Sequence, residues 1–241
     1  MIARILWLAL LAGVAAVTIG LQFDRQARKT YALAPAVPEI FRSSAQLPLA
    51  ASALGGDDPQ YALAQAEELV RRRPMPAEHL RVLAQAQFGA GKAEDAMLTI
   101  QYAAQRGWRD PLAQESLLRL AVENGDKPEA ARRYAALFLQ AATEDALLEE
   151  LGREVLAEPG GAGRQTLITI VGGGERWHRQ FLRRGARVMP PDAYVEIIEA
   201  TIASGAKYDC EVLQQVERGL TLRDADAGAR FAQAVEEACG G

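Results

Sequence analysis

The sequence contains few of the residues on which most enzymes and metalloproteins depend. Its 241 residues include only 2 His, 2 Cys and 5 Ser. No serine lies in a Gly-x-Ser-x-Gly motif, no His-Glu-x-x-His motif is present, and neither His lies at ligand spacing from a Cys. We therefore expect no catalytic residues, no bound metal and no cofactor, and we interpret the protein as non-enzymatic.

Aromatic residues are also scarce, at 6% of the chain, whereas Ala occurs 46 times and Leu 29 times. Ala and Leu have the most favourable helix propensities. The composition therefore predicts an all-α fold and argues against an all-β one.

An excess of positive charge is absent as well. The chain has a net charge of −4, and without residues 1–30 it has 23 basic and 30 acidic residues, a net charge of −7. Proteins that bind nucleic acids need basic residues to neutralise phosphates, so we expect no nucleic-acid partner. Two local basic clusters, Arg71-Arg72-Arg73 and Arg183-Arg184, are interpreted as charges at the C-terminal ends of helices, where they interact favourably with the helix dipole.

The longest uncharged run lies near the N-terminus, from Ile5 to Leu21. As a helix it spans roughly 26 Å, close to the thickness of the hydrocarbon core of a bilayer. We interpret residues 1–30 as a membrane anchor with its flank. A cleaved signal peptide and a buried helix of a soluble protein are the alternatives, but the best cleavage site, around Ala16, lies inside the run and not after it.

Two opposing arguments bear on the orientation of this anchor. Arg25, Arg28 and Lys29 follow the run while only Arg4 and the amino terminus precede it, so the positive-inside rule favours a cytoplasmic body. A signal anchor with so short a preceding segment instead leaves its amino end in the cytoplasm. We expect a single-pass protein of the inner membrane whose soluble body lies in the periplasm.

The segment after the anchor is rich in Ala and Pro. The Ala-Pro-Ala-Val-Pro pattern within residues 31–38 predicts an extended linker. A weak helix is expected from Pro38 to Leu54, interrupted at Pro48.

Residues 39–158 contain an internal repeat with an offset of 34. Each unit has two stretches with apolar residues at i, i+3, i+4 and i+7, separated by a turn that contains Gly, and this pattern predicts a pair of amphipathic helices. The matched positions include Leu83 with Leu117, Ala96 with Ala130, and Gly91 with Gly125.

The units that start at Ala77 and Pro111, and a preceding one from about Ser43, resemble the tetratricopeptide repeat (TPR), a family of α-solenoids built from 34-residue helix hairpins. The family positions are occupied by Leu80, Leu83, Ala84, Ala96, Ile100 and Ala103 in one unit and by Leu117, Leu118, Gly125, Ala130 and Tyr134 in the next. The departures from the family pattern are Gln87, Ala121 and Trp108. The resemblance implies a TPR-like α-solenoid that follows a single transmembrane helix.

The resemblance also implies that a protein or peptide partner binds on a concave surface formed by the first helix of each pair. The candidate binding residues exposed there are Arg81, Gln85, Phe88, Glu115, Arg119 and Glu123. Their mixed charge fits a partner segment that carries both signs. The Lys and Asn clamp with which some family members hold a C-terminal carboxylate is absent at these positions.

Beyond residue 158 the repeat fades. We interpret residues 159–241 as degenerate helical repeats that end in a capping helix over 224–237. The run Leu167–Val171 has strand propensity but no second strand to pair with, so we predict a short buried helix. Trp177 and Phe181, at i and i+4, are expected to pack into the joint between the two halves of the body, with a ligand platform as the alternative.

The two cysteines, Cys210 and Cys239, belong to the last two predicted helices, over 208–219 and 224–237. Antiparallel helices bring such residues together, and an oxidising compartment allows a disulfide. With the first helix ending near Gly219, the two cysteines differ in their distance from the turn by roughly 9 Å. The sequence therefore leaves two states open, a disulfide and a reduced Cys210 in the core.

Three functions are compatible with these features. The first is a membrane-anchored scaffold or adaptor that binds a protein partner in an envelope assembly, with polysaccharide or cell-wall machinery as one context. The second is a structural subunit of a larger membrane complex. The third is a helical envelope hydrolase, which would need a lone catalytic Glu such as Glu175. We expect the first.

Overall fold

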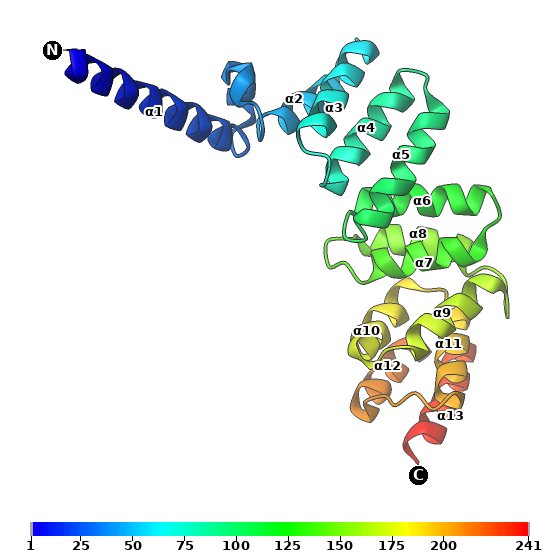
Figure 1. The fold of residues 1–241 in the computed structure, drawn as a ribbon. Coiled ribbons are helices and arrows are strands. Elements are labelled where there is room, and N and C mark those ends of the chain that lie inside the picture. Colours follow the sequence, from blue (N-terminus) through cyan, green and yellow to red (C-terminus); the bar gives the residue numbers. More distant parts are fainter. Residues whose placement is uncertain (1, 241) are drawn as a thin grey trace. The chain divides into compact units, whose positions relative to one another are not determined.

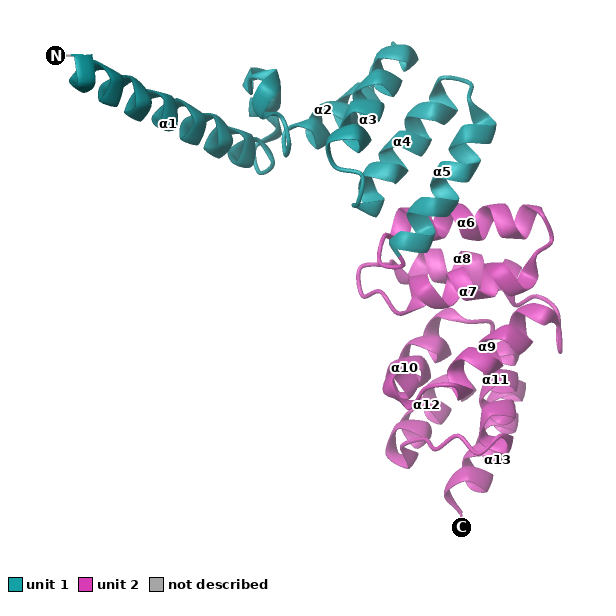
Figure 2. Cartoon of the chain, viewed as in Figure 1, with its two compact units in different colours: residues 1–107 teal, residues 108–241 magenta. Residues whose placement is uncertain are grey.

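The computed structural model describes residues 2–240, which form helices joined by short loops, with no strand among them (Figure 1). The predicted all-α fold is confirmed. The chain divides into two compact units, residues 1–107 and 108–241 (Figure 2). The division therefore falls inside the stretch 39–158 that the sequence presents as one run of repeats.

Unit 1 contains one long helix followed by short ones. These are α1 (Ile2–Ala27), the 3-10 helices η1 (Tyr31–Ala36) and η2 (Glu39–Phe41), α2 (Gln46–Ala53), α3 (Pro59–Arg72), α4 (Ala77–Gly89) and α5 (Ala93–Arg106). Helix α2 packs against α3, α3 against α4, and α4 against α5. The core of α2, α3 and α4 consists of small and aliphatic side chains, namely Ala50, Leu63, Ala66, Leu69, Val82 and Ala86.

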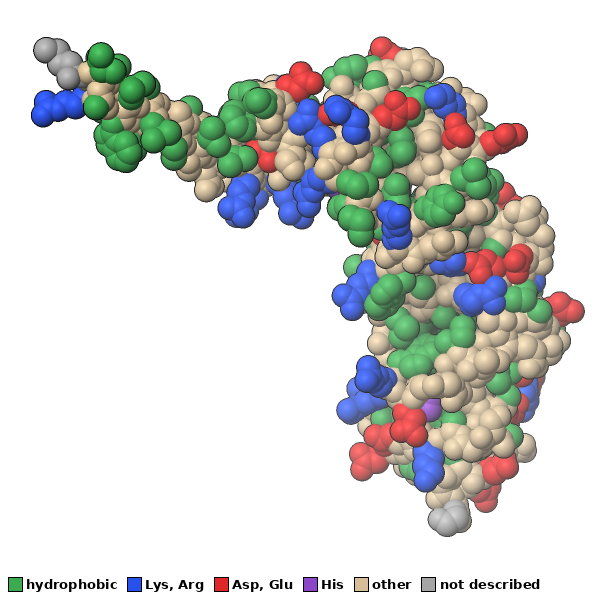
Figure 3. Space-filling model, in the orientation of Figure 1, with side chains coloured by type: hydrophobic (Ala, Val, Ile, Leu, Met, Phe, Trp, Pro, Cys, Tyr) green, Lys and Arg blue, Asp and Glu red, His purple; other side chains and the backbone are tan. Residues whose placement is uncertain are grey.

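Helix α1 is 26 residues long and apolar enough to cross a membrane. None of its apolar window is buried inside the protein. Figure 3 shows hydrophobic side chains along its length. The predicted apolar N-terminal helix is therefore confirmed.

The segment after α1 differs from the extended linker that the sequence predicts. Residues 31–38 contain η1, and the buried side chains of Ala34 and Val37 form a small core with Ala27 of α1 and Ala45. The composition predicts an extended chain. It does not reveal that the end of α1 offers this segment an apolar surface to pack against. The residues predicted as a spacer are thus part of the body.

The helix predicted from Pro38 to Leu54 is also divided differently. It consists of η2, a short connection and α2. Pro48 does not interrupt α2 because it lies in the first turn of that helix, where a backbone N–H has no partner within the helix.

A buried carboxylate ties the end of α1 to the start of α2. Asp24 is 3% exposed, and its Oδ1 accepts hydrogen bonds from the backbone N–H groups of Ser43, Ser44 and Ala45 at 2.8–3.0 Å. These amides precede α2, so Asp24 supplies from another helix the oxygen that an N-cap residue usually supplies locally. The rest of unit 1 is therefore joined to α1 by hydrogen bonds as well as by the covalent chain.

Aspartate residues fix where several other helices begin. In each case the side chain accepts a hydrogen bond from a backbone N–H of the first turn, and in α3, α6 and α7 a proline also occupies that turn. Both features favour a helix start at that residue. The capping residues are Asp58, Asp110, Asp126, Asp209 and Asp224.

Unit 2 consists of short helices around one core. They are α6 (Pro111–Glu123), α7 (Lys127–Phe138), α8 (Asp145–Val155), α9 (Ala162–Gly172), η3 (Glu175–Trp177), α10 (His178–Val188), α11 (Pro191–Ala203), α12 (Cys210–Arg223) and α13 (Ala225–Cys239). Helix α7 contacts α6, α8 and α9, and α13 contacts α11 and α12. The run Leu167–Val171 lies inside α9, so the predicted short helix is confirmed.

Helix hairpins recur at the predicted spacing. Helices α4 and α6 begin at Ala77 and Pro111, 34 residues apart, and the same interval separates the starts of α5 and α7. The turns contain Gly91 and Gly125, with φ angles of +78° and +71°, in the left-handed region that glycine adopts without strain. The two predicted units therefore form the same kind of hairpin.

Six of the fifteen aromatic residues gather in the core of unit 2. Neighbouring ring centroids are 5.7–6.4 Å apart, a spacing typical of favourable aromatic pairs. Because these rings come from α7, η3, α10, α11 and α13, they join helices on both sides of residue 158, where the sequence analysis placed a boundary. The residues are Tyr134, Phe138, Trp177, Phe181, Tyr194 and Phe231.

The last two helices have matching lengths, which the sequence analysis did not predict. Gly219 lies inside α12, which continues through residue 223, and the single residue Asp224 joins α12 to α13. Cys210 at the start of α12 therefore lies level with Cys239 at the end of α13. Their Sγ atoms form a disulfide, with the Cα atoms 6.0 Å apart.

Replacing Asp24 with Ala should loosen the junction between α1 and α2. The change leaves three buried or half-buried backbone N–H groups without their acceptor, at a cost of about 1–3 kcal/mol. Hydrogen exchange should become faster for the amides of residues 43–45. Asp24→Asn should have a smaller effect because its amide oxygen still accepts, and Asp57→Ala, at an exposed position, should have none.

Removing the disulfide should destabilise unit 2. Replacing both cysteines, Cys210→Ser with Cys239→Ser, opens a loop that the disulfide closes across a sequence separation of 29 residues. The lost constraint on the unfolded chain should lower the free energy of unfolding by about 3–4 kcal/mol. Circular dichroism should show the double variant unfolding at a lower temperature, and dithiothreitol should lower the midpoint of the wild type to the same value. An unchanged midpoint in the double variant would mean that the disulfide does not stabilise the fold.

Candidate binding surfaces

Three of the predicted binding residues lie on one face of α4 in unit 1. Arg81, Gln85 and Phe88 are spaced i, i+4 and i+7, and Nη1 of Arg81 donates a hydrogen bond to Oε1 of Gln85 at 3.4 Å. The side chain of Phe88 is 72% exposed. A partner that covered this ring would gain roughly 1.5–3 kcal/mol from its burial. This face is therefore suited to an apolar contact with a polar rim.

The other three predicted residues lie on α6 in unit 2, spaced i, i+4 and i+8. Arg119 is held by two carboxylates, Glu115 at 3.0 Å and Glu150 of α8 at 3.1 Å. The hydrogen bond from Arg119 to Glu115, with that to Glu150, raises the pKa of Arg119. Glu123 is exposed. The α6 face thus has three carboxylates for one paired guanidinium, and taken by itself it is acidic.

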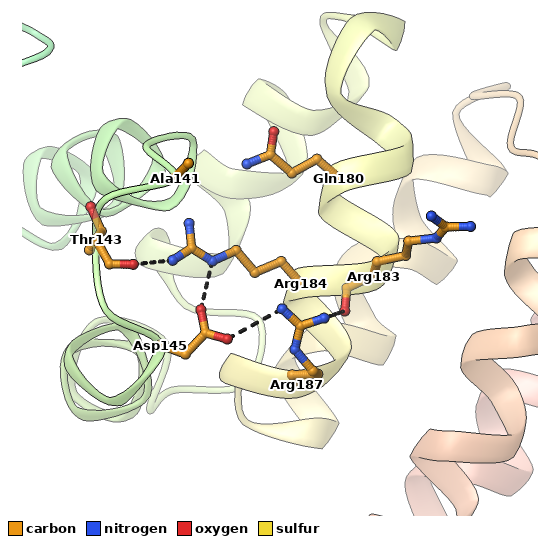
Figure 4. Close-up of a pocket in the computed structure, with 7 residues that line it drawn as sticks. All are labelled: Ala141, Thr143, Asp145, Gln180, Arg183, Arg184 and Arg187. Carbon is orange, nitrogen blue, oxygen red and sulfur yellow. Dashed lines mark hydrogen bonds and ion pairs between the residues drawn. The ribbon is translucent and has the colours of Figure 1, made fainter.

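A hollow of about 370 Å³ opens in unit 2 between α10 and the loop that joins α7 to α8. Figure 4 shows the guanidinium of Arg184 pointing toward that loop and the guanidinium of Arg187 turned toward Asp145, whereas the side chain of Arg183 extends away from Asp145. We call this site the arginine hollow. Its lining residues are Ala141, Thr143, Asp145, Gln180, Arg183, Arg184 and Arg187.

Arg184 forms the floor of the arginine hollow and is 8% exposed. Its Nε donates to Oδ1 of Asp145 at 2.9 Å, and its Nη1 donates to the carbonyl oxygens of Phe138 at 2.7 Å and Gln140 at 2.9 Å. Its Nη2 donates to the carbonyl oxygen of Thr143. Four of the five guanidinium N–H groups are therefore used within the protein. Arg184 holds the loop in place and has little capacity left for a ligand.

The exposed side of α10 carries a row of arginines. Arg179, Arg183 and Arg187 are spaced i, i+4 and i+8, and we call them the arginine face. Arg187 donates to Oδ2 of Asp145 at 3.3 Å, whereas Arg179 and Arg183 form no ion pair within residues 2–240. Because unit 2 has 16 basic against 22 acidic residues, a net charge of −6, the arginine face is a local exception to its acidic surroundings. Exposed guanidinium groups bind carboxylates and phosphates, often through two hydrogen bonds.

Asp145 remains charged beside these arginines. Burial raises its pKa, but hydrogen bonds and charge from Arg184 and Arg187 lower it by more, so the pKa lies below its usual value. The stabilisation that the carboxylate provides is present above the unfolded pKa of about 3.9 and is lost as the pH falls through the lower folded pKa. At neutral pH one carboxylate thus faces two guanidinium groups.

Contrary to the prediction from their sequence pattern, Arg183 and Arg184 do not lie at the end of a helix. Helix α10 continues to Val188, so both lie in its interior. A local signal for the burial of Arg184 does exist, because the residue follows the buried Phe181 by three positions and precedes the buried Val188 by four. Its partners lie 39 to 46 residues earlier in the chain, and no sequence pattern links them to it.

Other candidate chemistry finds little support in the part of the chain that the structure describes. No group of three or more His, Cys, Asp and Glu side chains there could hold a metal ion. Glu175 is exposed in η3. Comparison with known proteins finds no matching family model and no matching curated protein. The roles of these surfaces therefore have to follow from their geometry and charge.

Replacing Arg184 with Met should destabilise unit 2 by about 3–5 kcal/mol, because it leaves three carbonyl oxygens without this donor and Asp145 with only the bond from Arg187. Arg184→Lys should cost less, since it keeps the charge but not the forked geometry. The matched control is Arg183→Met, the same chemical change at an exposed position, which should stay within about 0.5 kcal/mol of wild type. Urea unfolding measures all three, and equal losses at positions 183 and 184 would contradict the structural role of Arg184.

Proposed function

We propose that the protein is a non-catalytic scaffold, anchored in a membrane by α1, whose TPR-like helical body binds an acidic segment of a protein partner. The observation that carries the proposal is the arginine face, on which Arg179 and Arg183 are exposed and have no carboxylate partner among the described residues. In a unit with a net charge of −6, such a face attracts an acidic segment while the rest of the surface repels it. This difference orients the partner.

The rigidity of α10 supports a binding role. On its inner side Phe181 and Leu182 are fully buried, and Arg184 joins the helix to the loop before α8. The backbone that carries Arg179 and Arg183 is therefore held before a partner arrives. A preorganised surface loses less conformational entropy on binding than a flexible one.

The helix hairpins support a partner that is a protein. The 34-residue interval between equivalent helices and the left-handed glycine in each turn agree with the TPR resemblance, and hairpins of that family present exposed helix faces to protein segments. The α4 face gives unit 1 a second candidate surface for a protein partner. Its exposed Phe88 ring could make an apolar contact, which the charged arginine face cannot.

The proposed location is a membrane with the body outside the cytoplasm. The length and hydropathy of α1 support single-pass anchoring. The Cys210–Cys239 disulfide supports an oxidising compartment for the body, because disulfides persist outside the cytoplasm and are rare within it. The disulfide outweighs the basic residues that follow the apolar run, which favour the opposite orientation.

The test is binding of an acidic probe to the detergent-solubilised full chain. A fluorescent polyglutamate peptide should bind the wild type in a salt-dependent manner. Arg179→Gln with Arg183→Gln should weaken polyglutamate binding by about tenfold, or 1.4 kcal/mol. The matched control is Arg153→Gln with Arg218→Gln, which removes the same charge from other exposed positions of unit 2.

Capture of cellular partners by a C-terminal tag, after mild detergent extraction, compares the two surfaces. A partner lost with the Arg179 and Arg183 double variant supports the arginine face. A partner retained there but lost with Arg81→Ala, Phe88→Ala and Arg119→Ala combined would assign binding to the α4 and α6 faces instead. Equal polyglutamate binding by wild type, double variant and control would contradict the proposal outright.

A further inference from the structure

The basic residues that follow the apolar run lie at or just beyond the lipid headgroups if α1 spans a membrane. The apolar run ends at Leu21, and the first basic side chain beyond it belongs to Arg25. At the rise of an α-helix, Arg25 lies about 6 Å past the run, and the headgroup layer extends roughly 5–7 Å beyond each side of the hydrocarbon core. Arg28 and Lys29 lie up to one turn further, and their long side chains can bend back toward the phosphates.

These three basic side chains have no partner inside the protein. Arg25, Arg28 and Lys29 are exposed, and none of them forms an ion pair with another described residue. The adjacent carboxylate, Asp24, is turned inward to the amides before α2 and forms no ion pair with them. Figure 3 shows Lys and Arg side chains gathered where the hydrophobic length of α1 ends.

The body also reaches back to the edge of the apolar run. The ring of Phe41 in η2 lies against Gly20, so closely that a Cβ atom at Gly20 would be 2.6 Å from it. Because Gly20 belongs to the apolar run, η2 lies at the boundary of the hydrocarbon core. Its neighbour Ile40 is 83% exposed, and Tyr31 is 68% exposed. Tyr31 begins η1, which also contacts α1, and tyrosine side chains are typical of a membrane interface.

The surroundings of η2 are compatible with an anionic surface. Glu39, the acidic residue of η2, lies 4.0 Å from Nη2 of Arg72 and is paired on that side. Arg72 also donates to the carbonyl oxygens of Glu39 and Arg42. These bonds fix η2 against α3, and the Asp24 bonds fix α2 against α1, so the surface keeps its shape.

We infer that this surface, which we call the juxtamembrane collar, binds the headgroups of anionic phospholipids. Its basic side chains contact the phosphates, and Ile40 and Tyr31 enter the layer between headgroups and acyl chains. The collar consists of Arg25, Arg28, Lys29, Tyr31 and Ile40. The inference rests on the anchoring by α1 proposed above, because the same bilayer that holds α1 supplies the ligand. Unit 1 is then seated on the membrane surface and not suspended above it.

The test is the lipid preference of the full-length chain. Purified protein in neutral detergent receives phosphatidylglycerol and phosphatidylcholine in equal amounts, and native mass spectrometry counts the lipids that it retains. The wild type should retain at least about fivefold more phosphatidylglycerol, since a basic residue at a membrane surface contributes roughly a fivefold preference for anionic lipid. Arg25→Gln, Arg28→Gln and Lys29→Gln combined should reduce the ratio to near one.

The matched control replaces the same residue types elsewhere, with Arg153→Gln, Arg218→Gln and Lys207→Gln at exposed positions of unit 2, and it should retain the wild-type ratio. A charge-preserving variant, Arg25→Lys with Arg28→Lys, should also retain it, which guards against a loss caused by misfolding. Equal retention of both lipids by the wild type, or equal losses in the collar variant and its control, would overturn the inference.

A second measurement separates the collar from the anchor itself. In nanodiscs that contain phosphatidylglycerol, the amides of residues 39–41 should exchange more slowly than in discs of phosphatidylcholine alone, and Ile40→Ser should reduce this difference. Failure of the chain to enter discs of either kind would contradict the anchoring by α1. Normal insertion without any lipid preference would contradict only the collar.

Discussion

No helix of the body is long enough to persist on its own. Helices α2 to α13 have 8 to 15 residues, and isolated helices below about 12–15 residues are marginal in water. Each helix therefore depends on contact with a neighbour. The abundance of alanine meets this requirement, because fully buried residues such as Ala66, Ala103 and Ala130 allow helix backbones to approach closely. The stability of the body therefore comes from packing between helices and not from any single helix.

Buried guanidinium groups also join helices. Arg164, 2% exposed, donates to the carbonyl oxygen of Leu156 and to the carboxylates of Asp192 and Glu196. Arg184 makes the same kind of connection between a loop and α10. Each side chain satisfies a carbonyl oxygen near the end of one helix and a carboxylate of another. The bonds of Arg184 fix α10 and with it the positions of Arg179 and Arg183, which take no part in these bonds.

The helix starts could be read from the sequence far better than the helix ends and the long-range contacts. Starts at Pro111 and in the C-terminal helices follow from Asp and Pro, which act on their own first turn. The predicted end of the helix at Gly219 was wrong. A glycine inside a helix costs only about 1 kcal/mol, and packing outweighs this cost. Helical spacing was enough to place Arg81, Gln85 and Phe88 on one face. The arginine hollow could not be predicted, because its floor, Arg184, is held by hydrogen bonds to residues 39 to 46 positions earlier in the chain.

The bonds of Asp24 have a mechanical consequence. An anchor followed by a loose tether lets a body swivel, so that its faces point in every direction around the membrane normal. Here α2 starts from three amides fixed to the side of α1, and any rotation or tilt of α1 turns the first hairpin by the same angle. If two copies associated through their α1 helices, their first hairpins, formed by α2 and α3, would be held at a fixed angle to each other. Association of α1 helices inside the bilayer would therefore fix the relative orientation of the two first hairpins outside it.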